Sequence, residues 1–160
     1  MPSETLAALA DLPPRGRLLG LDLGSKTIGL ALSDSLRSVA SPLETIRRRK
    51  LGHDMERLQA AIAERQPVAL VLGLPLNMDG SEGPRAQSTR QFARNIAARG
   101  IALPLAFWDE RLSTAAVERF LVEEADVSRA RRARVVDKMA AAYILQGALD
   151  ALARFGPPAS

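Results

Sequence analysis

The chain has 160 residues, no cysteine, 47% hydrophobic and 25% charged residues, and a formal net charge of +4. This composition excludes disulfides, thiolate metal sites and a cysteine nucleophile, and neither a signal peptide nor a run of about 18 apolar residues that would cross a membrane is visible. We therefore expect one soluble domain in the cytoplasm, with a basic surface that favours a polyanionic partner.

Arginine supplies most of the positive charge and gathers in two clusters. One cluster runs from Arg47 to Lys50, and the other contains Arg129, Arg131, Arg132 and Arg134. Either cluster alone fits the solvated face of an arginine-rich protein. Together with a carboxylate site, they favour nucleic acid as the partner.

The first part of the chain predicts three successive strands. The apolar runs Leu18 to Leu23 and Ile28 to Leu32 are separated by four turn residues, which is typical of a β-hairpin. A third extended segment is predicted from Val39 to Ile46, because Pro42 breaks any helix there and Thr45 favours a strand.

The middle of the chain predicts a helix, a buried strand, a loop and a second helix. Residues 53–66 carry apolar residues at helical spacing, and Pro67 ends that helix. Val68 to Leu74 is continuously apolar, as in a strand covered on both faces. The loop of residues 75–84 follows this strand, and binding sites in open α/β sheets usually lie at strand ends.

The last part of the chain predicts a strand and two helices. Residues 101–108 form an apolar strand that Pro104 places near a sheet edge. Ser113 is the expected cap of one helix, and a final helix carries apolar residues from Met139 to Leu152. The expected order is βββαβαβαα without internal repeats. The expected divisions are a flexible extension at 1–16, one folded domain at 17–154 and a tail at 155–160.

Asp22 lies inside an apolar strand, between Leu21 and Leu23. A buried carboxylate needs a metal ion, a cation or several hydrogen-bond donors. The alternative is an aspartate beside a turn that accepts bonds from local backbone amides. The turn that follows contains Ser25 and Lys26 next to glycine, which permits these residues to face a phosphate.

Two later segments also carry acids. Asp109 and Glu110 follow an apolar strand, and because successive strand side chains point to opposite faces, one of the two is expected to reach the site. The alternative is that both begin the next helix, where acids favour the helix dipole. Asp137 precedes small residues that let a helix pack closely on a sheet, although a solvated acid paired with an arginine fits as well.

Three acids on separate elements suit Mg²⁺ or Mn²⁺, which prefer oxygen ligands. Such an ion activates water and stabilises a leaving oxygen in phosphoryl transfer. The single histidine, His53, lies among polar residues and is expected at the surface, and no histidine accompanies a serine in a recognisable triad. We interpret Lys26, Asn77 and Arg85, in or beside glycine-containing loops, as residues that position substrate phosphates.

Four ordered blocks of sequence carry a family resemblance. They are Gly20 to Ala31 with Ser33 and Asp34, Val71 to Gly80, Trp108 to Thr114, and Asp137 to Gln146. These blocks resemble the YqgF family of Holliday junction resolvase-like nucleases, which is linked to maturation of the small-subunit ribosomal RNA precursor. The resemblance implies an α/β, RNase H-like fold with a central mixed five-stranded sheet flanked by helices, and metal-dependent hydrolysis of structured nucleic acid.

The resemblance also assigns residues. It implies that Asp22, Glu110 and Asp137 are the catalytic metal ligands, and it matches Gly73, Pro75 and Asn77 to the family's Gly-x-Pro-x-Asn loop. The four residues from Lys138 to Ala141 provide no second acid after Asp137, unlike related junction resolvases. Two arrangements therefore stay open: a two-metal site, or one tightly held ion with a second ion recruited by the substrate.

The leading hypothesis is a nuclease that processes the 5′ end of the small-subunit ribosomal RNA precursor, with the ribosome as a candidate partner. One alternative is a resolvase acting on branched DNA as a symmetric homodimer, and another is a noncatalytic nucleic-acid-binding module. An ATPase is a third alternative, because the Asp-x-Gly start resembles the actin and sugar-kinase superfamily, but this chain has the length of one lobe. The sequence leaves open the choice of RNA or DNA, endo- or exonucleolytic cleavage, and monomer or homodimer.

Overall fold

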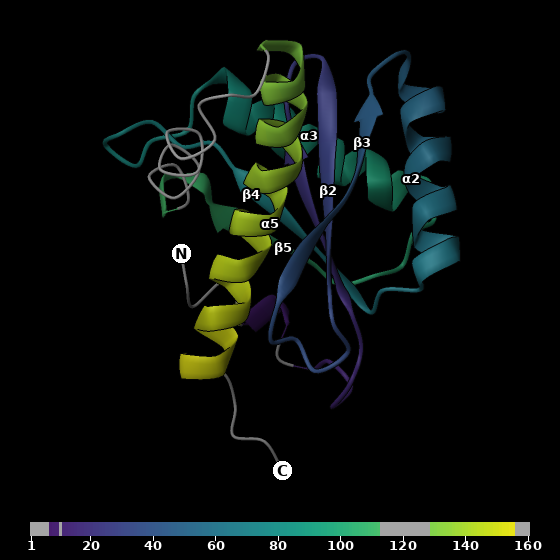
Figure 1. Ribbon diagram of the computed structural model, residues 1–160, viewed down its shortest axis with the longest axis vertical. Coiled ribbons are helices and arrows are strands. Elements are labelled where there is room, and N and C mark those ends of the chain that lie inside the picture. Colours follow the sequence, from purple (N-terminus) through teal and green to yellow (C-terminus); the bar gives the residue numbers. More distant parts are fainter. Residues whose placement is uncertain (1–6, 10, 113–128, 156–160) are drawn as a thin grey trace.

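The computed structural model describes residues 7–9, 11–112 and 129–155, and for residues 112, 129–138 and 155 it describes the backbone alone. Five strands form one sheet in the order β3-β2-β1-β4-β5 (Figure 1). The strands are β1 (Leu18–Leu23), β2 (Thr27–Ser33), β3 (Ala40–Arg47), β4 (Ala69–Leu74) and β5 (Leu105–Asp109). The pairs β1–β2 and β2–β3 are antiparallel, whereas β1–β4 and β4–β5 are parallel. The predicted mixed five-stranded sheet is confirmed.

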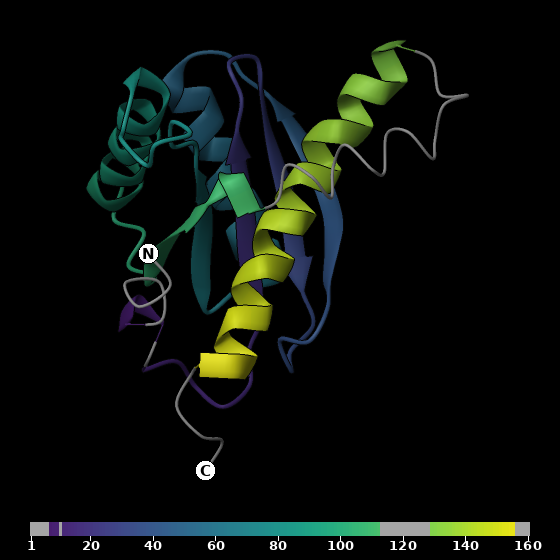
Figure 2. The ribbon, with the colours of Figure 1, turned by 90° about the vertical axis from the view of Figure 1, so that its left-hand side faces the viewer.

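Helices cover both faces of the sheet. The helices are α2 (Leu51–Arg65), α3 (Pro84–Ala98) and α5 (Arg129–Phe155), and a short 3₁₀ helix η1 (Glu110–Leu112) follows β5. Helices α2 and α3 lie on one face, and α5 crosses the other and leans away from the sheet toward its N-terminal end (Figure 2). The helix expected from Ser113 onward lies outside the described residues. No described helix is both long and apolar enough to span a membrane.

Strand alternation explains why two separate apolar clusters form. Leu19, Leu21 and Leu23 pack with residues of α2 and α3, whereas Leu18 packs with residues of α5. Even-numbered positions of β1 therefore face α5, because successive strand side chains point to opposite faces. Asp22 belongs to this second set.

Helix α5 packs closely on β1 and β4 because both strands carry glycine beneath it. A Cβ atom at Gly20 would lie 2.9 Å from the Cβ of Leu145, and one at Gly73 would lie 2.5 Å from the Cδ1 of Ile144. These distances are shorter than van der Waals contact, so the helix sits where any larger residue would push it away.

Two details of the sheet edges differ from the simple strand pattern. Strand β5 begins at Leu105 rather than at residue 101, and the carbonyl of Pro104 accepts a 2.9 Å bond from the backbone N–H of Leu70. The apolar residues before Pro104 thus lead into the strand without belonging to it. In β3, the register shifts opposite Leu30 and Ala31, and Ala31 pairs with Pro42.

The beginning of β3 is fixed to α5 by one side chain. The Oε1 atom of Gln146 accepts a 2.9 Å bond from the backbone N–H of Ala40, and its Nε2 donates a 3.0 Å bond to the carbonyl of Ser38. The N-terminal segment also reaches this face, because Leu9 is buried in the cluster around α5. Helix α5 is therefore held across the sheet at several points.

Candidate active site

The carboxyl ends of β1, β4 and β5 lie at the same end of the sheet because the three strands run parallel. Asp22 is the last residue but one of β1, and Glu110 directly follows β5 at the start of η1. Between them, β4 leads into the loop of residues 75–83. This end thus carries two predicted acids and the predicted phosphate-binding loop.

The carboxyl groups of Asp22 and Glu110 share a hydrogen bond. Burial, this hydrogen bond and repulsion by Asp22 raise the pKa of Glu110 to about 8, and the nearby charge of Arg85 opposes the rise. The two carboxyl groups therefore hold a shared proton at neutral pH. A cation at the same place would replace that proton and permit both groups to ionise.

Gly73 of β4 provides the space in which Glu110 lies. A Cβ atom at this position would lie 2.8 Å from Oε1 and 2.9 Å from Cγ of Glu110. A side chain there would displace both the Glu110 carboxylate and the side chain of Ile144, whose Cδ1 would lie 2.5 Å from the added Cβ. The glycine of the loop motif is therefore required by packing against the candidate site, at a strand position without positive φ.

Asp137 lies in α5, one helical turn before Ala141. The carbonyl oxygen of Ala141 would lie 3.3 Å from a Cβ atom at Gly20, which is two residues before Asp22 in β1. The backbone of Asp137 thus belongs to the part of α5 that extends toward the end of the sheet holding Asp22. Its side chain lies outside the description, and its role as a ligand stays a prediction.

Within the described residues, no group of three or more acidic, histidine or cysteine side chains is placed to hold a metal ion. Two of the three predicted ligands are described, and both are carboxylates in contact with each other. Oxygen donors of this kind match the preference of Mg²⁺ and Mn²⁺. The described part of the site therefore fits such an ion, although it supplies two of the three predicted ligands.

Asp109 points away from this pair and binds Arg111. The Nε atom of Arg111 lies 3.0 Å from each carboxylate oxygen of Asp109, and Nη2 lies 2.6 Å from Oδ2. Burial opposes ionisation of Asp109, but the hydrogen bonds from Arg111 outweigh it and lower the pKa of the carboxyl group. The carboxylates of Asp109 and Glu110 thus diverge, as strand alternation predicts.

Arg111 also holds the loop between β4 and α3. Its Nη1 donates a 3.1 Å bond to the carbonyl of Met78. Within the loop, the side-chain amide of Asn77 donates a 3.0 Å bond to the hydroxyl of Ser81, and Asp79 accepts bonds from the backbone N–H and hydroxyl of Ser81. The loop is therefore an ordered turn tied to the end of β5.

The three predicted phosphate ligands lie at this end of the sheet in different settings. Arg85 is an exposed residue in the first turn of α3, and its charge acts on Glu110. Lys26 is exposed in the turn between β1 and β2. Asn77 is exposed, but its amide is engaged within the loop. The structure brings Arg85 close to the carboxylate pair, whereas Lys26 and Asn77 lie on neighbouring turns.

Arg111 and Gly73 take part in the site although sequence reasoning did not single out a role for either beside the acids. The spacing of Asp109 and Arg111 was a usable signal, because a buried aspartate needs a partner and an arginine two residues later can reach it. His53, by contrast, lies on α2 with its Nδ1 3.1 Å from Asp54, and its side chain is 35% exposed. The surface position expected for this histidine is confirmed.

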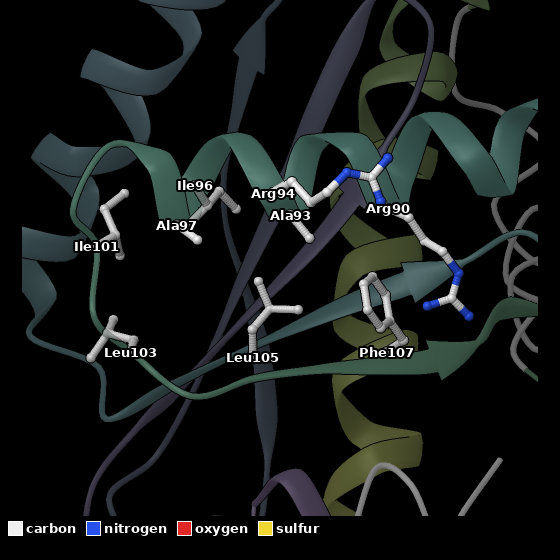
Figure 3. Close-up of a pocket in the computed structure, with 9 residues that line it drawn as sticks. All are labelled: Arg90, Ala93, Arg94, Ile96, Ala97, Ile101, Leu103, Leu105 and Phe107. Atoms are coloured by element: carbon white, nitrogen blue, oxygen red, sulfur yellow. The ribbon is translucent and has the colours of Figure 1, made fainter.

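An apolar groove of about 280 Å³ lies between α3 and β5, on the sheet face opposite α5 (Figure 3). Aliphatic side chains of both elements line it, and Arg90 and Arg94 lie at its border. The guanidinium of Arg90 stacks 4.8 Å over the ring of Phe107 and pairs with Glu82. No acid lines this groove, so it is separate from the carboxylate pair.

The strand order and the helices on both faces define an RNase H-like fold. The family model and the curated relatives make the chain a nuclease, an enzyme that hydrolyses phosphodiester bonds. Residues 16–151 match the family model described as "RuvX: Holliday junction resolvase". The chain belongs to this family, which confirms the resemblance drawn from its four sequence blocks.

Curated relatives match almost the whole chain. A "Putative pre-16S rRNA nuclease" of Rhodobacter capsulatus is 62% identical over 147 residues, which cover 92% of this chain and 91% of the relative. A protein of the same name from Rhodospirillum rubrum is 60% identical over 158 residues, which cover 98% of each chain.

Solved structures with low sequence identity share the fold. RuvC of T. thermophilus in complex with a Holliday junction substrate matches with a TM-score of 0.59 at 16% identity, covering 89% of this chain and 99% of that one. The yeast mitochondrial Holliday junction resolvase Ydc2 matches with a TM-score of 0.52 at 10% identity, covering 92% and 85% of the two chains. These likenesses establish the RNase H-like fold.

Proposed function

We propose that this nuclease is metal-dependent and processes the 5′ end of the small-subunit ribosomal RNA precursor. The observation that carries the metal dependence is the shared hydrogen bond between the carboxyl groups of Asp22 and Glu110 at one sheet edge. The names of the curated relatives support the choice of precursor ribosomal RNA. This substrate places the reaction in the cytoplasm, with the ribosome as a candidate partner.

The proposed metal ligands are Asp22, Glu110 and Asp137, and the proposed ion is Mg²⁺ or Mn²⁺. When bound, such an ion lowers the pKa of water and neutralises charge that develops on phosphate oxygens. Asp22 and Glu110 give up their shared proton to provide two oxygen donors, and Asp137 provides the third from α5. Gly73 keeps the Glu110 carboxylate close to Asp22.

The proposed phosphate-positioning residues are Lys26, Asn77 and Arg85. The guanidinium of Arg85 is exposed and acts on the charge of Glu110, so a phosphate held there lies beside the carboxylates. The Arg111 contact at Met78 fixes the loop that contains Asn77, and Lys26 approaches from the turn after β1. Their shared task is to orient the substrate backbone for attack.

The first test is the substitution Asp22→Asn, which preserves side-chain size and removes one ligand charge. Purified protein should cleave precursor ribosomal RNA with Mg²⁺ or Mn²⁺, lose activity with chelator, and lose it in the variant, while the fold and most nucleic-acid binding persist. Asp11→Asn is the matched control, because Asp11 is exposed in the N-terminal segment. Wild-type cleavage by the Asp22 variant, or cleavage after removal of divalent metal, would contradict the proposal.

A DNA junction resolvase is the second candidate, favoured by the family description and by the fold shared with a RuvC–Holliday junction complex. The same purified protein is therefore given precursor ribosomal RNA and a four-way DNA junction in parallel. Preferential, symmetric cleavage of the junction by a homodimer would favour the resolvase. Metal-independent binding without cleavage of either substrate would instead favour a noncatalytic binding module.

A further inference from the structure

We infer that the end of β3 and the start of α2 form a second phosphate-binding surface, outside the cleavage site, which holds the substrate backbone. This outer basic surface consists of Arg47, Arg49 and Lys50. The inference rests on the proposed nuclease function and adds to it a set of residues that bind the substrate away from the scissile phosphate.

The strand register places this surface on the same side of the sheet as Asp22. Asp22 pairs with Gly29, Gly29 pairs with Thr45, and Arg47 lies two residues beyond Thr45. Neighbouring strands lie about 4.8 Å apart and residues rise by about 3.4 Å, so the Cα atoms of Asp22 and Arg47 are separated by about 12 Å. Ile46 packs toward α2, and Arg47 therefore faces the side of α5 and Asp22.

The turn between β1 and β2 lies between the two places along the end of the sheet. Gly24 begins this turn, which leads to Lys26 and then to the partner strand of β3. The side chain of Lys26 is exposed on that turn. A nucleic-acid backbone that extends from the carboxylate pair toward β3 thus passes Lys26 before it reaches the outer basic surface.

Three hydrogen bonds hold the surface in an ordered conformation. Asp54, which is 1% exposed, accepts a 2.9 Å bond from the backbone N–H of Arg49. Arg48 turns inward: its backbone N–H donates to the carbonyl of Lys26, and its Nη1 donates to the carbonyl of Gly24, both at 2.8 Å. The segment is therefore fixed to the turn after β1, and the side chains on either side of Arg48 remain at the surface.

The charges on this surface are not neutralised by the described part of the protein. Arg47, Arg49 and Lys50 are exposed, and no described carboxylate forms an ion pair with them. Two acids of β3 and α2 have other partners, since Glu44 pairs with Arg57 and Asp54 with Arg48 and the backbone N–H of Arg49. Three like charges on an ordered segment repel one another, and a polyanion relieves that repulsion while releasing counterions.

The chemistry of the surface selects the nucleic-acid backbone rather than the bases. Between Gly24 and Asp54 the sequence has no Phe, Tyr or Trp, so the surface has no platform on which a base would stack. A separation of about 12 Å corresponds to three or four nucleotides at about 3.4 Å of rise per nucleotide. The surface thus holds phosphates a few nucleotides from the one that is cleaved.

The test compares two triple variants that remove equal charge from opposite ends of the sheet. The outer variant carries Arg47→Ala, Arg49→Ala and Lys50→Ala. The control variant carries alanine at three other exposed cations, Arg15, Arg17 and Arg154, which lie toward the start of β1 and the end of α5. Affinity is measured with chelator present, over a range of salt concentrations, for duplex RNA and duplex DNA of one sequence.

We expect the outer variant to lose at least about tenfold in affinity at moderate salt, with a log–log salt slope shallower by about 3. The control variant should lose less than about threefold. If affinity falls equally for duplex RNA and duplex DNA, the surface binds the phosphate backbone that both share. If affinity falls for one of them only, the surface binds that nucleic acid. Equal losses in both variants, or no loss in the outer variant, would overturn the inference. Circular dichroism and thermal unfolding check that both variants fold.

This test separates the surface from the proposed metal-dependent cleavage. The affinities are measured without metal, so they do not depend on cleavage. When both triple variants are also made in Asp22→Asn protein, the outer variant should lose the same affinity relative to the control variant, whether or not Asp22→Asn protein cleaves. In cleavage assays, the outer variant should raise KM for a long duplex but leave a short substrate that ends near the scissile phosphate unaffected. A KM increase of the same size for both substrates would count against the surface.

Discussion

At the scale of single residues, Gly73 determines how closely the Glu110 carboxylate approaches Asp22. The glycine is buried in β4, and both Glu110 and Ile144 occupy the volume that a side chain would take. Both must shift if a methyl group is added, because atoms of each would lie within 3.0 Å of it. The end of the Ile144 side chain is flexible, but the carboxylate belongs to the candidate site.

We predict that Gly73→Ala lowers cleavage although the protein still folds. Overpacking of this kind costs about 1–3 kcal/mol of stability, and a displacement of a catalytic group by about 1 Å reduces the rate about 100-fold. Urea unfolding and cleavage kinetics measure the two effects. Gly52→Ala is the control, because nothing lies within 4 Å of its added methyl on α2, and it should add about 0.5–1 kcal/mol without changing cleavage. A normal kcat in the Gly73→Ala protein would show that Glu110 tolerates the shift.

At the scale of elements, Arg111 joins η1, the end of β5 and the loop before α3. Its guanidinium binds Asp109 through Nε and Nη2 and the carbonyl of Met78 through Nη1. The end of β5 and η1 are thus joined to a loop more than 30 residues earlier in the chain through one planar group. The loop that contains Asn77 owes its position to this contact.

We predict that Arg111→Lys loosens the loop while its charge is retained. A lysine cannot donate to both oxygens of Asp109 and to Met78 at once, so about 1–3 kcal/mol of stability should be lost. Hydrogen exchange in residues 75–83 should speed up, and KM should rise more than kcat falls. Arg94→Lys on the exposed side of α3 is the control, since Arg94 bonds to Gln91 within its own helix. Unchanged exchange in the loop would show that Arg111 does not hold it.

The elements were largely predictable because local patterns determine them. The β1–β2 hairpin and the apolar run of β4 follow from short stretches of sequence, and alternation predicted that Asp109 and Glu110 point apart. The start of β5 was wrong by four residues, because the apolar residues after 101 resemble a strand although Pro104 lies outside it. Two features depend on tertiary packing, which no local sequence pattern contains. They are the contact of Gly73 with Glu110 and α5, and the hydrogen bond from Arg111 to the loop before α3.

At the scale of the whole molecule, the raised pKa of Glu110 makes folding stability depend on pH. The pKa of this carboxyl group is about 8 in the folded protein, against an ordinary value of 4.5. Below about pH 4.5 both the folded and the unfolded chain keep the proton. Between that pH and about 8 the unfolded chain releases it first, so ionisation favours unfolding. The contribution of Glu110 to stability is therefore present in acid and is lost as pH rises through this window.

We predict that the metal-free wild-type protein has a lower free energy of unfolding at pH 8 than at pH 5.5. Glu110→Gln cannot ionise, so its stability should vary less over the same range. Urea unfolding in chelator measures both proteins, and Glu56→Gln on the exposed face of α2 is the control that should follow the wild type. If wild type and Glu110→Gln show the same pH dependence, the shared proton is absent.

The two prolines near the sheet edges bear on how the protein behaves at high concentration. Among the described strands, β3 is one edge of the sheet, and it carries Pro42 at the place where its register with β2 shifts. Proline offers no N–H to another strand, and a bulge bends the edge away from a flat template. Pro104 stands directly before β5, the other edge strand of the described sheet. The two prolines therefore disfavour pairing of copies through either edge strand, which is the first step toward fibrils. The end of the sheet that carries the candidate site then stays accessible to substrate at high protein concentration.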